Sequence, residues 1–160
     1  MSDYDADALA GFDDFFGRVL ASLTPSARRR AGRKLGQALL RANLKRIAGN
    51  MEPDGGAMEK RKRRLDARGR LRRKAGGKMF RRLRLAREWR VDAQPDSVEI
   101  MPRRGDGVAR THHFGLRGFV GKGPDGKRVF TRYPTRRLLG FAREDEQLAM
   151  DIAADLIEGD

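Results

Sequence analysis

The stretch ARTHHFGLRGFVGKGPDGKRVFTRYPTRRLLGF, residues 109–141, decides the fold of this chain. It contains both histidines, and apolar residues alternate with charged ones around the turn signal Gly-Pro-Asp-Gly at 123–126. The pattern predicts a short turn or helix at 109–115, then a β-hairpin, then a rigid Tyr133–Pro134 step into residues 138–140. No catalytic grouping stands out in it, so the stretch predicts a structural surface.

The composition indicates a small core. A chain of 160 residues is by default a single domain, here residues 1–160. Charged residues make up 36%, so part of the chain is expected to be loop or interface. The absence of cysteine excludes disulfides and thiolate metal sites. No apolar run approaches the roughly 18 residues of a membrane span, and the N-terminus is acidic, so we expect an intracellular, soluble protein with no membrane partner.

The basic charge is concentrated in one block. Between Lys60 and Arg90 there are sixteen Lys and Arg residues against two acids, which gives that block a net charge of +14. The formal charge of the whole chain is also +14, so the rest is neutral overall. The net positive charge must therefore be interpreted as a property of residues 60–90 and not of the whole chain.

Four helices are predicted outside the central stretch, three of them in the N-terminal and C-terminal parts of the chain. Residues 1–23 form an acidic, amphipathic segment with apolar residues at helical spacing. Thr24 reads as an N-cap followed by Pro25 at the first helical position, and a Gly-Asn pair follows the predicted end near Ala48. Residues 143–158 show apolar helical spacing with three acids in the first turn.

The middle of the chain is less regular. Residues 51–77 begin with a Pro-Asp-Gly-Gly turn and continue as a long basic loop, which we expect to be solvated or disordered. The apolar residues of 79–86 predict a short amphipathic helix. Alternation from Trp89 to Met101 around a turn at 94–97 predicts a hairpin with one buried face. Because strands cluster instead of alternating with helices, the predicted class is α+β: N-terminal helices, a small antiparallel sheet built from hairpins, and a C-terminal helix.

Two local patterns are similar to catalytic or ligand-binding motifs. Residues 121–127 fit the phosphate-binding pattern G-x-x-x-x-G-K, but Arg128 stands where Ser or Thr must coordinate magnesium, and a strand follows where a helix is required. His112 and His113 are the only histidines, and neighbours in a strand point to opposite sides. We therefore expect no metal, cofactor or catalytic site, and assign the histidines to packing or an intersubunit hydrogen bond.

The basic block leaves two partners open. Its cations are the electrostatic signature of nucleic-acid binding, although it lacks interleaved aromatic residues and fits no nucleic-acid module. An acidic protein partner is the main rival, and the acidic ends of this chain make self-association one version of it.

Five short motifs stand in a fixed order along residues 20–158. They are Pro-Ser-Ala-Arg-Arg at 25–29, Pro-Asp-Gly at 53–55, Lys-Met-Phe-Arg-Arg-Leu-Arg at 78–84, His-His-Phe-Gly-Leu at 112–116 and Arg-Tyr-Pro-Thr-Arg-Arg-Leu-Leu-Gly at 132–140. The ordered set resembles the virion morphogenesis or tail completion family of contractile-tailed, Mu-like and related phages. Where members usually read His-Gln-Phe-Gly or His-Gln-Tyr-Gly, this chain reads His-His-Phe-Gly at 112–115. Where members read Tyr-Pro-Ala-Arg-Glu-Leu-Leu-Gly, it reads Tyr-Pro-Thr-Arg-Arg-Leu-Leu-Gly at 133–140.

The resemblance implies a structural virion protein, not an enzyme, that completes the tail at its head-proximal end and joins it to the neck. Its working form would be a ring, sixfold by similarity to tail terminators, in contact with tail tube or sheath proteins, neck or head-completion proteins and packaged DNA. It would be located in the virion tail or neck, and in the host cytoplasm during assembly. The alternative is a small basic nucleic-acid-binding protein.

Two sets of residues are the candidates for these contacts. The expected subunit-interface and packing residues are His113, Phe114, Gly115, Tyr133, Pro134, Leu138 and Leu139. The expected contacts to DNA or an acidic partner are Lys60, Arg61, Lys62, Arg63, Arg64, Arg70, Arg72 and Arg73.

Overall fold

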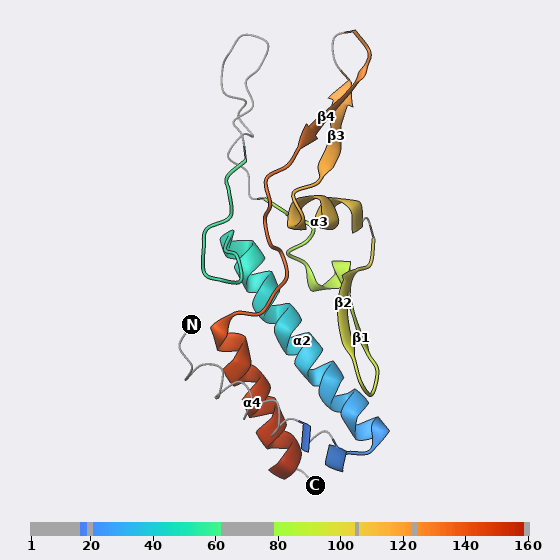
Figure 1. Cartoon of the computed structure of the whole chain (residues 1–160), viewed down its shortest axis with the longest axis vertical. Helices are drawn as coiled ribbons and strands as arrows, with labels where there is room; N and C mark the ends of the chain where they lie inside the picture. Colours follow the sequence, from blue (N-terminus) through green and yellow to red (C-terminus); the bar gives the residue numbers. More distant parts are fainter. Residues whose placement is uncertain (1–16, 19–20, 62–78, 105, 123–124, 159–160) are drawn as a thin grey trace. The chain divides into compact units, whose positions relative to one another are not determined.

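The structure is a computed structural model that describes residues 17–18, 21–61, 79–104, 106–122 and 125–158 (Figure 1). The predicted α+β class is confirmed. The predicted acidic helix at 1–23 lies almost entirely outside the described residues, as does most of the basic loop. The described elements are α2 (Pro25–Gly49), the 3-10 turn η1 (Ala86–Glu88), β1 (Trp89–Ala93), β2 (Val98–Pro102), α3 (Asp106–His113), β3 (Arg117–Lys122), β4 (Arg128–Arg132) and α4 (Arg143–Glu158).

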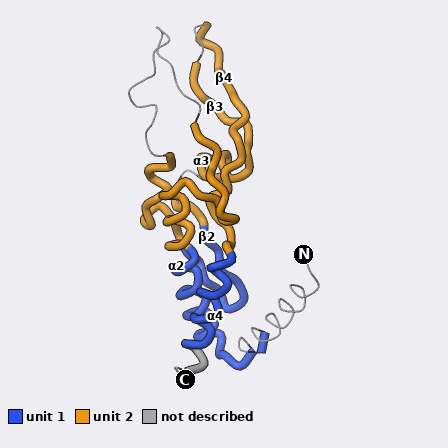
Figure 2. Tube along the Cα trace, turned by 90° about the vertical axis from the view of Figure 1, so that its left-hand side faces the viewer, with its two compact units in different colours: residues 1–39, 91–100, 143–160 blue, residues 40–90, 101–142 orange. Residues whose placement is uncertain are grey.

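The chain divides into two compact units (Figure 2). Unit 1 comprises Met1–Leu39, Val91–Ile100 and Arg143–Asp160, and unit 2 comprises Leu40–Arg90 and Met101–Ala142. Helix α2 and the hairpin β1–β2 contribute residues to both units. The expectation of a single domain over residues 1–160 stays a prediction.

Helix α2 begins and ends where the sequence predicts. The Thr24 hydroxyl accepts a hydrogen bond from the Ala27 amide at 3.3 Å, which satisfies one of the free amides of the first turn. At the other end Asn50 takes a left-handed φ of 55°, and the next amide donates to the Arg46 carbonyl at 2.9 Å. This 6→1 bond is the Schellman ending that the Gly-Asn pair indicates.

In unit 1, helix α2 packs closely against the hairpin. A Cβ at Gly36 would lie 2.5 Å from Val91 and 2.7 Å from Val98, so only glycine allows the strands to approach the helix this closely. Lys34 of the same helix forms a 2.6 Å ion pair with Asp155 of α4. The predicted hairpin and the predicted C-terminal helix are both confirmed.

The helix predicted at 79–86 is wrong. This segment is a series of turns that ends in η1, and Phe80 has a left-handed φ of 54°. The buried Trp89 indole donates to the Leu83 carbonyl at 2.9 Å, an acceptor that a continuing helix needs for its own ladder. Tertiary packing of two aromatic side chains therefore overrides the local helical pattern.

In unit 2, the predicted hairpin of the central stretch is confirmed as β3 and β4, which pair antiparallel (Figure 1). Phe119 pairs with Phe130 and Gly121 with Val129, so Val120 is an extra, bulged residue. The two histidines lie at the C-terminal end of α3 and not in a strand, which corrects the argument that they point to opposite sides of one.

Candidate functional site

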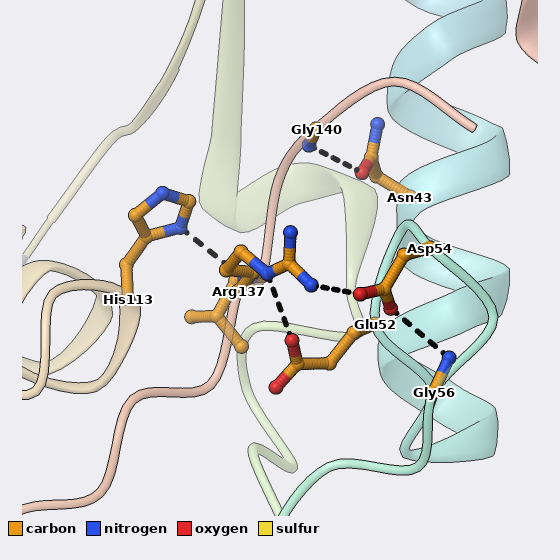
Figure 3. Close-up of polar contacts among 8 residues, drawn as sticks. Asn43, Glu52, Asp54, Gly56, His113, Arg137 and Gly140 are labelled. Atoms are coloured by element: carbon orange, nitrogen blue, oxygen red, sulfur yellow. Dashed lines mark hydrogen bonds and ion pairs between the residues drawn. The ribbon is translucent and has the colours of Figure 1, made fainter. Parts of the chain in front are cut away.

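Segment 133–140 follows β4 without regular secondary structure and is held in place by its side chains (Figure 3). The Arg137 guanidinium donates to the Glu52 carboxylate at 2.8 Å and also pairs with the Asp54 carboxylate. The Asp54 carboxylate accepts the amide of Gly56 at 3.0 Å, so the Pro-Asp-Gly turn is shaped to present its acid. Hydrogen bonds from the Gly56 amide and from Arg137 lower the pKa of Asp54. In turn, the carboxylates of Glu52 and Asp54 raise the pKa of Arg137.

The end of the segment is fixed to helix α2. The Gly140 amide donates to the Asn43 side-chain oxygen at 3.0 Å (Figure 3). The Gly140 carbonyl accepts a hydrogen bond from Arg46 at 3.3 Å. Between these anchors Leu138 is buried, with 2% of its surface exposed. Because Leu138 is buried, this segment belongs to the core of unit 2. Full burial of a leucine side chain contributes about 1.5–3 kcal/mol to the stability of the folded state.

Arg136 is the most deeply buried cation of the segment, with 3% of its surface exposed. Its Nε donates to the Glu59 carbonyl at 2.6 Å, and Nη2 donates to the Lys60 carbonyl at 3.3 Å. Its Nη1 donates to Nδ1 of His112 at 2.9 Å. One guanidinium thus ties the start of the basic block to α3.

Both histidines are held in the neutral form. A guanidinium and an amide only donate, so Nδ1 of His112, facing Arg136, and Nδ1 of His113, 3.2 Å from the Leu138 amide, must be unprotonated. Burial, together with the charges of Arg136 and Arg61, lowers the pKa of His112 to about 4. Burial also lowers the pKa of His113, with a further contribution from Arg137. Neutral histidines at this place serve as hydrogen-bond acceptors.

Gly115 is the turn between α3 and β3. Its φ is +61°, and a Cβ there would lie 2.5 Å from the Thr135 hydroxyl and 3.2 Å from the Tyr133 carbonyl. Its own carbonyl accepts from Arg132 at 3.3 Å. The position therefore demands glycine for both its backbone conformation and its space.

The hairpin β3–β4, which we call the arm (residues 117–132), exposes large apolar side chains. Phe119 is 47% exposed and Phe130 41% exposed, although their rings meet edge to face at 5.8 Å. The Arg128 guanidinium lies 5.1 Å from the first ring and 5.4 Å from the second, and Arg117 lies 5.1 Å from the Phe130 ring. Phe114, before the arm, is 60% exposed. Contiguous exposed apolar side chains of this kind mark a binding surface.

The candidate interface residues lie together in unit 2, but they are not equivalent. His113, Gly115 and Leu138 are packing residues that shape the segment. Phe114 is exposed, and Tyr133, Pro134 and Leu139 are partly buried. Of the candidate basic contacts, Lys60 and Arg61 are described and exposed at the start of the loop. The others lie outside the described residues: Lys62, Arg63, Arg64, Arg70, Arg72 and Arg73.

Sequence reasoning missed the two arginines that organise the site. In the sequence, Arg136 and Arg137 stand out only as part of the motif at 132–140, and their partners Glu52, Asp54 and His112 are distant in sequence. The only signal was the clustering of motifs around Pro-Asp-Gly and His-His-Phe-Gly, which does not pair specific side chains.

The described part of the chain contains neither a cluster of metal ligands nor a membrane-spanning helix. Within it, no three acidic or histidine side chains gather as metal ligands. None of its helices has the length and apolar character to cross a bilayer.

Comparison with known proteins identifies the class. Residues 7–158 match the model of the phage virion morphogenesis family, so the chain belongs to that family, as the resemblance predicted. It is a structural protein of virion assembly and not an enzyme. Tail completion protein S of Escherichia phage P2 is 33% identical to the chain over 146 residues, covering 88% of this chain and 91% of the relative. No solved structure matches the chain with significance.

Proposed function

We propose that this chain completes the phage tail at its head-proximal end and makes that end competent to join the neck. The observation that carries the proposal is the similarity to tail completion protein S over nearly the whole of both chains. The working form is a closed ring, which we expect to be sixfold. Its partners are further copies of itself, tail tube or sheath proteins, and neck or head-completion proteins.

The exposed arm supports a role in assembly. A closed ring of one kind of chain needs two unlike patches on each subunit, because each copy contacts the next head to tail. The arm and Phe114 supply one patch, with apolar side chains that are 38–60% exposed in the part of the chain that the structure describes. The base of the arm is held in position by the packing residues Gly115 and Leu138 and by the Tyr133 amide, which donates to the Leu116 carbonyl at 3.1 Å.

The basic loop serves a second contact. Residues 60–74 carry ten Lys and Arg against the single acid Asp66, so they suit an acidic neighbour or the DNA channel of the tail. In this proposal the loop is attached to the body through Arg136, whose side chain holds the carbonyls of Glu59 and Lys60.

A deletion tests the proposal. A phage that lacks this chain should produce tail tubes and filled heads that remain separate in electron micrographs, and the chain supplied in trans should restore joined, infectious particles. Joined and infectious particles without the chain would contradict it.

The competing function is nucleic-acid binding, favoured by the +14 charge of residues 60–90. A protein that makes 6–10 phosphate contacts loses roughly 10³–10⁵ in affinity between 50 and 200 mM salt. A monomer that ignores tail tubes and binds duplex DNA with that salt dependence would support this alternative over tail completion.

A further inference from the structure

A pocket of about 350 Å³ opens where α3, the base of the arm and segment 133–136 meet in unit 2. Pockets that hold small ligands are about 300–1,000 Å³ in volume, so this pocket lies at the small end of that range. Its walls combine cations with apolar side chains, and none of the described residues that line it is acidic. The residues that matter for its chemistry are Arg61, Arg132 and Arg136 and, among the apolar ones, Phe80, Val108 and Val120.

The chemistry of the pocket selects an occupant. Three arginines together with apolar side chains in one lining favour an occupant that brings a carboxylate and an aromatic or aliphatic side chain together. Arg136 is already buried, and its hydrogen-bond partners among the described residues are two carbonyls and a neutral imidazole. A carboxylate at the pocket therefore meets positive charge that is in large part already desolvated, which strengthens the attraction.

The arm extends the same surface. Residues 117–132 carry five Lys and Arg and one acid, a net charge of +4, beside the exposed rings of Phe119 and Phe130. Val120, the bulged residue of β3, lines the pocket and is partly exposed. Pocket and arm thus form one basic and apolar surface.

One segment of the same chain has the complementary composition. Residues 1–16 contain five aspartates, no Lys or Arg, and the four aromatic residues Tyr4, Phe12, Phe15 and Phe16. Asp13 and Asp14 stand directly between Phe12 and Phe15, which places carboxylates beside aromatic rings in the sequence. Opposite charge and matched apolar content make it the best counterpart that the sequence offers.

We propose that this pocket binds the acidic, aromatic N-terminal segment of a second copy of the chain. The contact is head to tail, with the donor segment 1–16 of one subunit and the acceptor pocket and arm of the next. It rests on the proposed ring and names the two unlike patches that the ring requires. Duplex DNA is the rival occupant, but its phosphate backbone has no apolar group that could fill the apolar part of the pocket.

Engineered cysteines test the contact in the full-length chain, because the natural chain has none. Gly11→Cys places a thiol beside the donor aromatics, and Val120→Cys places one at the pocket. The two variants are mixed under mild oxidation, alone and with tail tubes, and disulfide-linked dimers are measured on non-reducing gels. Arg87→Cys, whose native side chain is 80% exposed, is the matched acceptor control.

We expect linked dimers of Gly11→Cys with Val120→Cys at least tenfold above those with Arg87→Cys. Adding Arg132→Glu to the acceptor should reduce the yield about tenfold, and Asp13→Arg with Asp14→Arg in the donor should restore it. Fluorescence of Trp89 confirms that each variant is folded.

A yield no higher than the Arg87→Cys control, with and without tubes, would overturn the proposal. Two further results would also overturn it. One is a disulfide that forms in a double variant, with Gly11→Cys and Val120→Cys on the same chain, but not between the two single variants. The other is displacement of the donor by duplex DNA. A separate measurement, the mass of the wild-type protein in solution, tests whether the ring forms. Rings without this cross-link would refute the contact alone, and a cross-link in open dimers would refute the ring alone.

Discussion

Nη1 of Arg136 lies 2.9 Å from Nδ1 of His112, and this contact joins the segment after the arm to helix α3. It is reinforced by the amide of Arg136, which donates to the His112 carbonyl at 2.7 Å. The imidazole also packs edge-on against Phe80 at 5.0 Å and Tyr133 at 4.7 Å. The base of the arm is therefore fixed by a neutral histidine that accepts a hydrogen bond from a buried arginine.

Arg136→Ala should destabilise unit 2 by about 3 kcal/mol, because it leaves the Glu59 and Lys60 carbonyls and the His112 ring nitrogen without their donor. Urea unfolding followed by the fluorescence of the buried Trp89 measures the loss. Arg104→Ala, at an exposed position, is the control and should stay within about 0.5 kcal/mol. Equal stability of the two variants would show that Arg136 does not organise the site.

The free energy of unfolding should fall as the pH drops from about 6.5 towards 4. The folded pKa of His112 is lowered to about 4 and that of His113 is also lowered, so the unfolded state binds more protons in this window. His112→Asn keeps an acceptor for Arg136 but cannot titrate. Its stability should depend less on pH over this window in the same urea assay, and an unchanged dependence would contradict the neutral-histidine assignment.

Gly115→Ala should cost about 2–4 kcal/mol, because the residue combines left-handed φ with a collision against the Thr135 hydroxyl. Gly126→Ala is a matched control in the turn of the arm. Its φ is +75°, but no atom lies within 4 Å of the added Cβ, so only the conformational cost of about 1–2 kcal/mol applies. Thermal unfolding of the two variants should differ accordingly, and equal melting temperatures would refute the close packing.

The elements with local signals were predictable from the sequence. Thr24 and Pro25 mark the start of α2, the Gly-Asn pair marks its end, and the acids after Arg143 open α4. The arm followed from alternation around Gly-Pro-Asp-Gly. In each case the deciding interaction lies within a few residues of the signal, so the sequence alone contains it.

The site was less predictable, because its contacts join residues far apart in the chain. Nothing near Arg136 indicates that it is buried against His112, and Arg137 finds its acids more than eighty positions away. The helix expected at 79–86 failed for the same reason, since Trp89 takes the carbonyl of Leu83. Resemblance to the family located the motifs but did not pair their side chains.

Phe114→Ala should leave the fold intact and block assembly. The side chain is 60% exposed, so its removal should change stability by less than about 1 kcal/mol. Tails made with the variant should remain unjoined to heads in electron micrographs. Complete rings and infectious particles from Phe114→Ala would remove this residue from the interface.

Neutralising Arg61, Arg63 and Arg64 to glutamine should also spare the fold. Arg61 is exposed, and surface charges of this kind contribute little to stability. The triple variant should keep the Trp89 unfolding transition and lose affinity for its acidic or nucleic-acid partner at low salt, as measured by co-sedimentation. Loss of the folded state instead would show that this part of the loop is structural.

The mass and position of the wild-type protein on purified tail tubes test tail completion most directly. Native mass measurement and electron microscopy are made at low and moderate salt, with and without tubes that lack the chain. We expect a closed ring, in solution or assembled at one end of each tube in fixed stoichiometry, that tolerates moderate salt. A monomer that never marks a tube end and binds DNA or RNA with a steep salt dependence would contradict it.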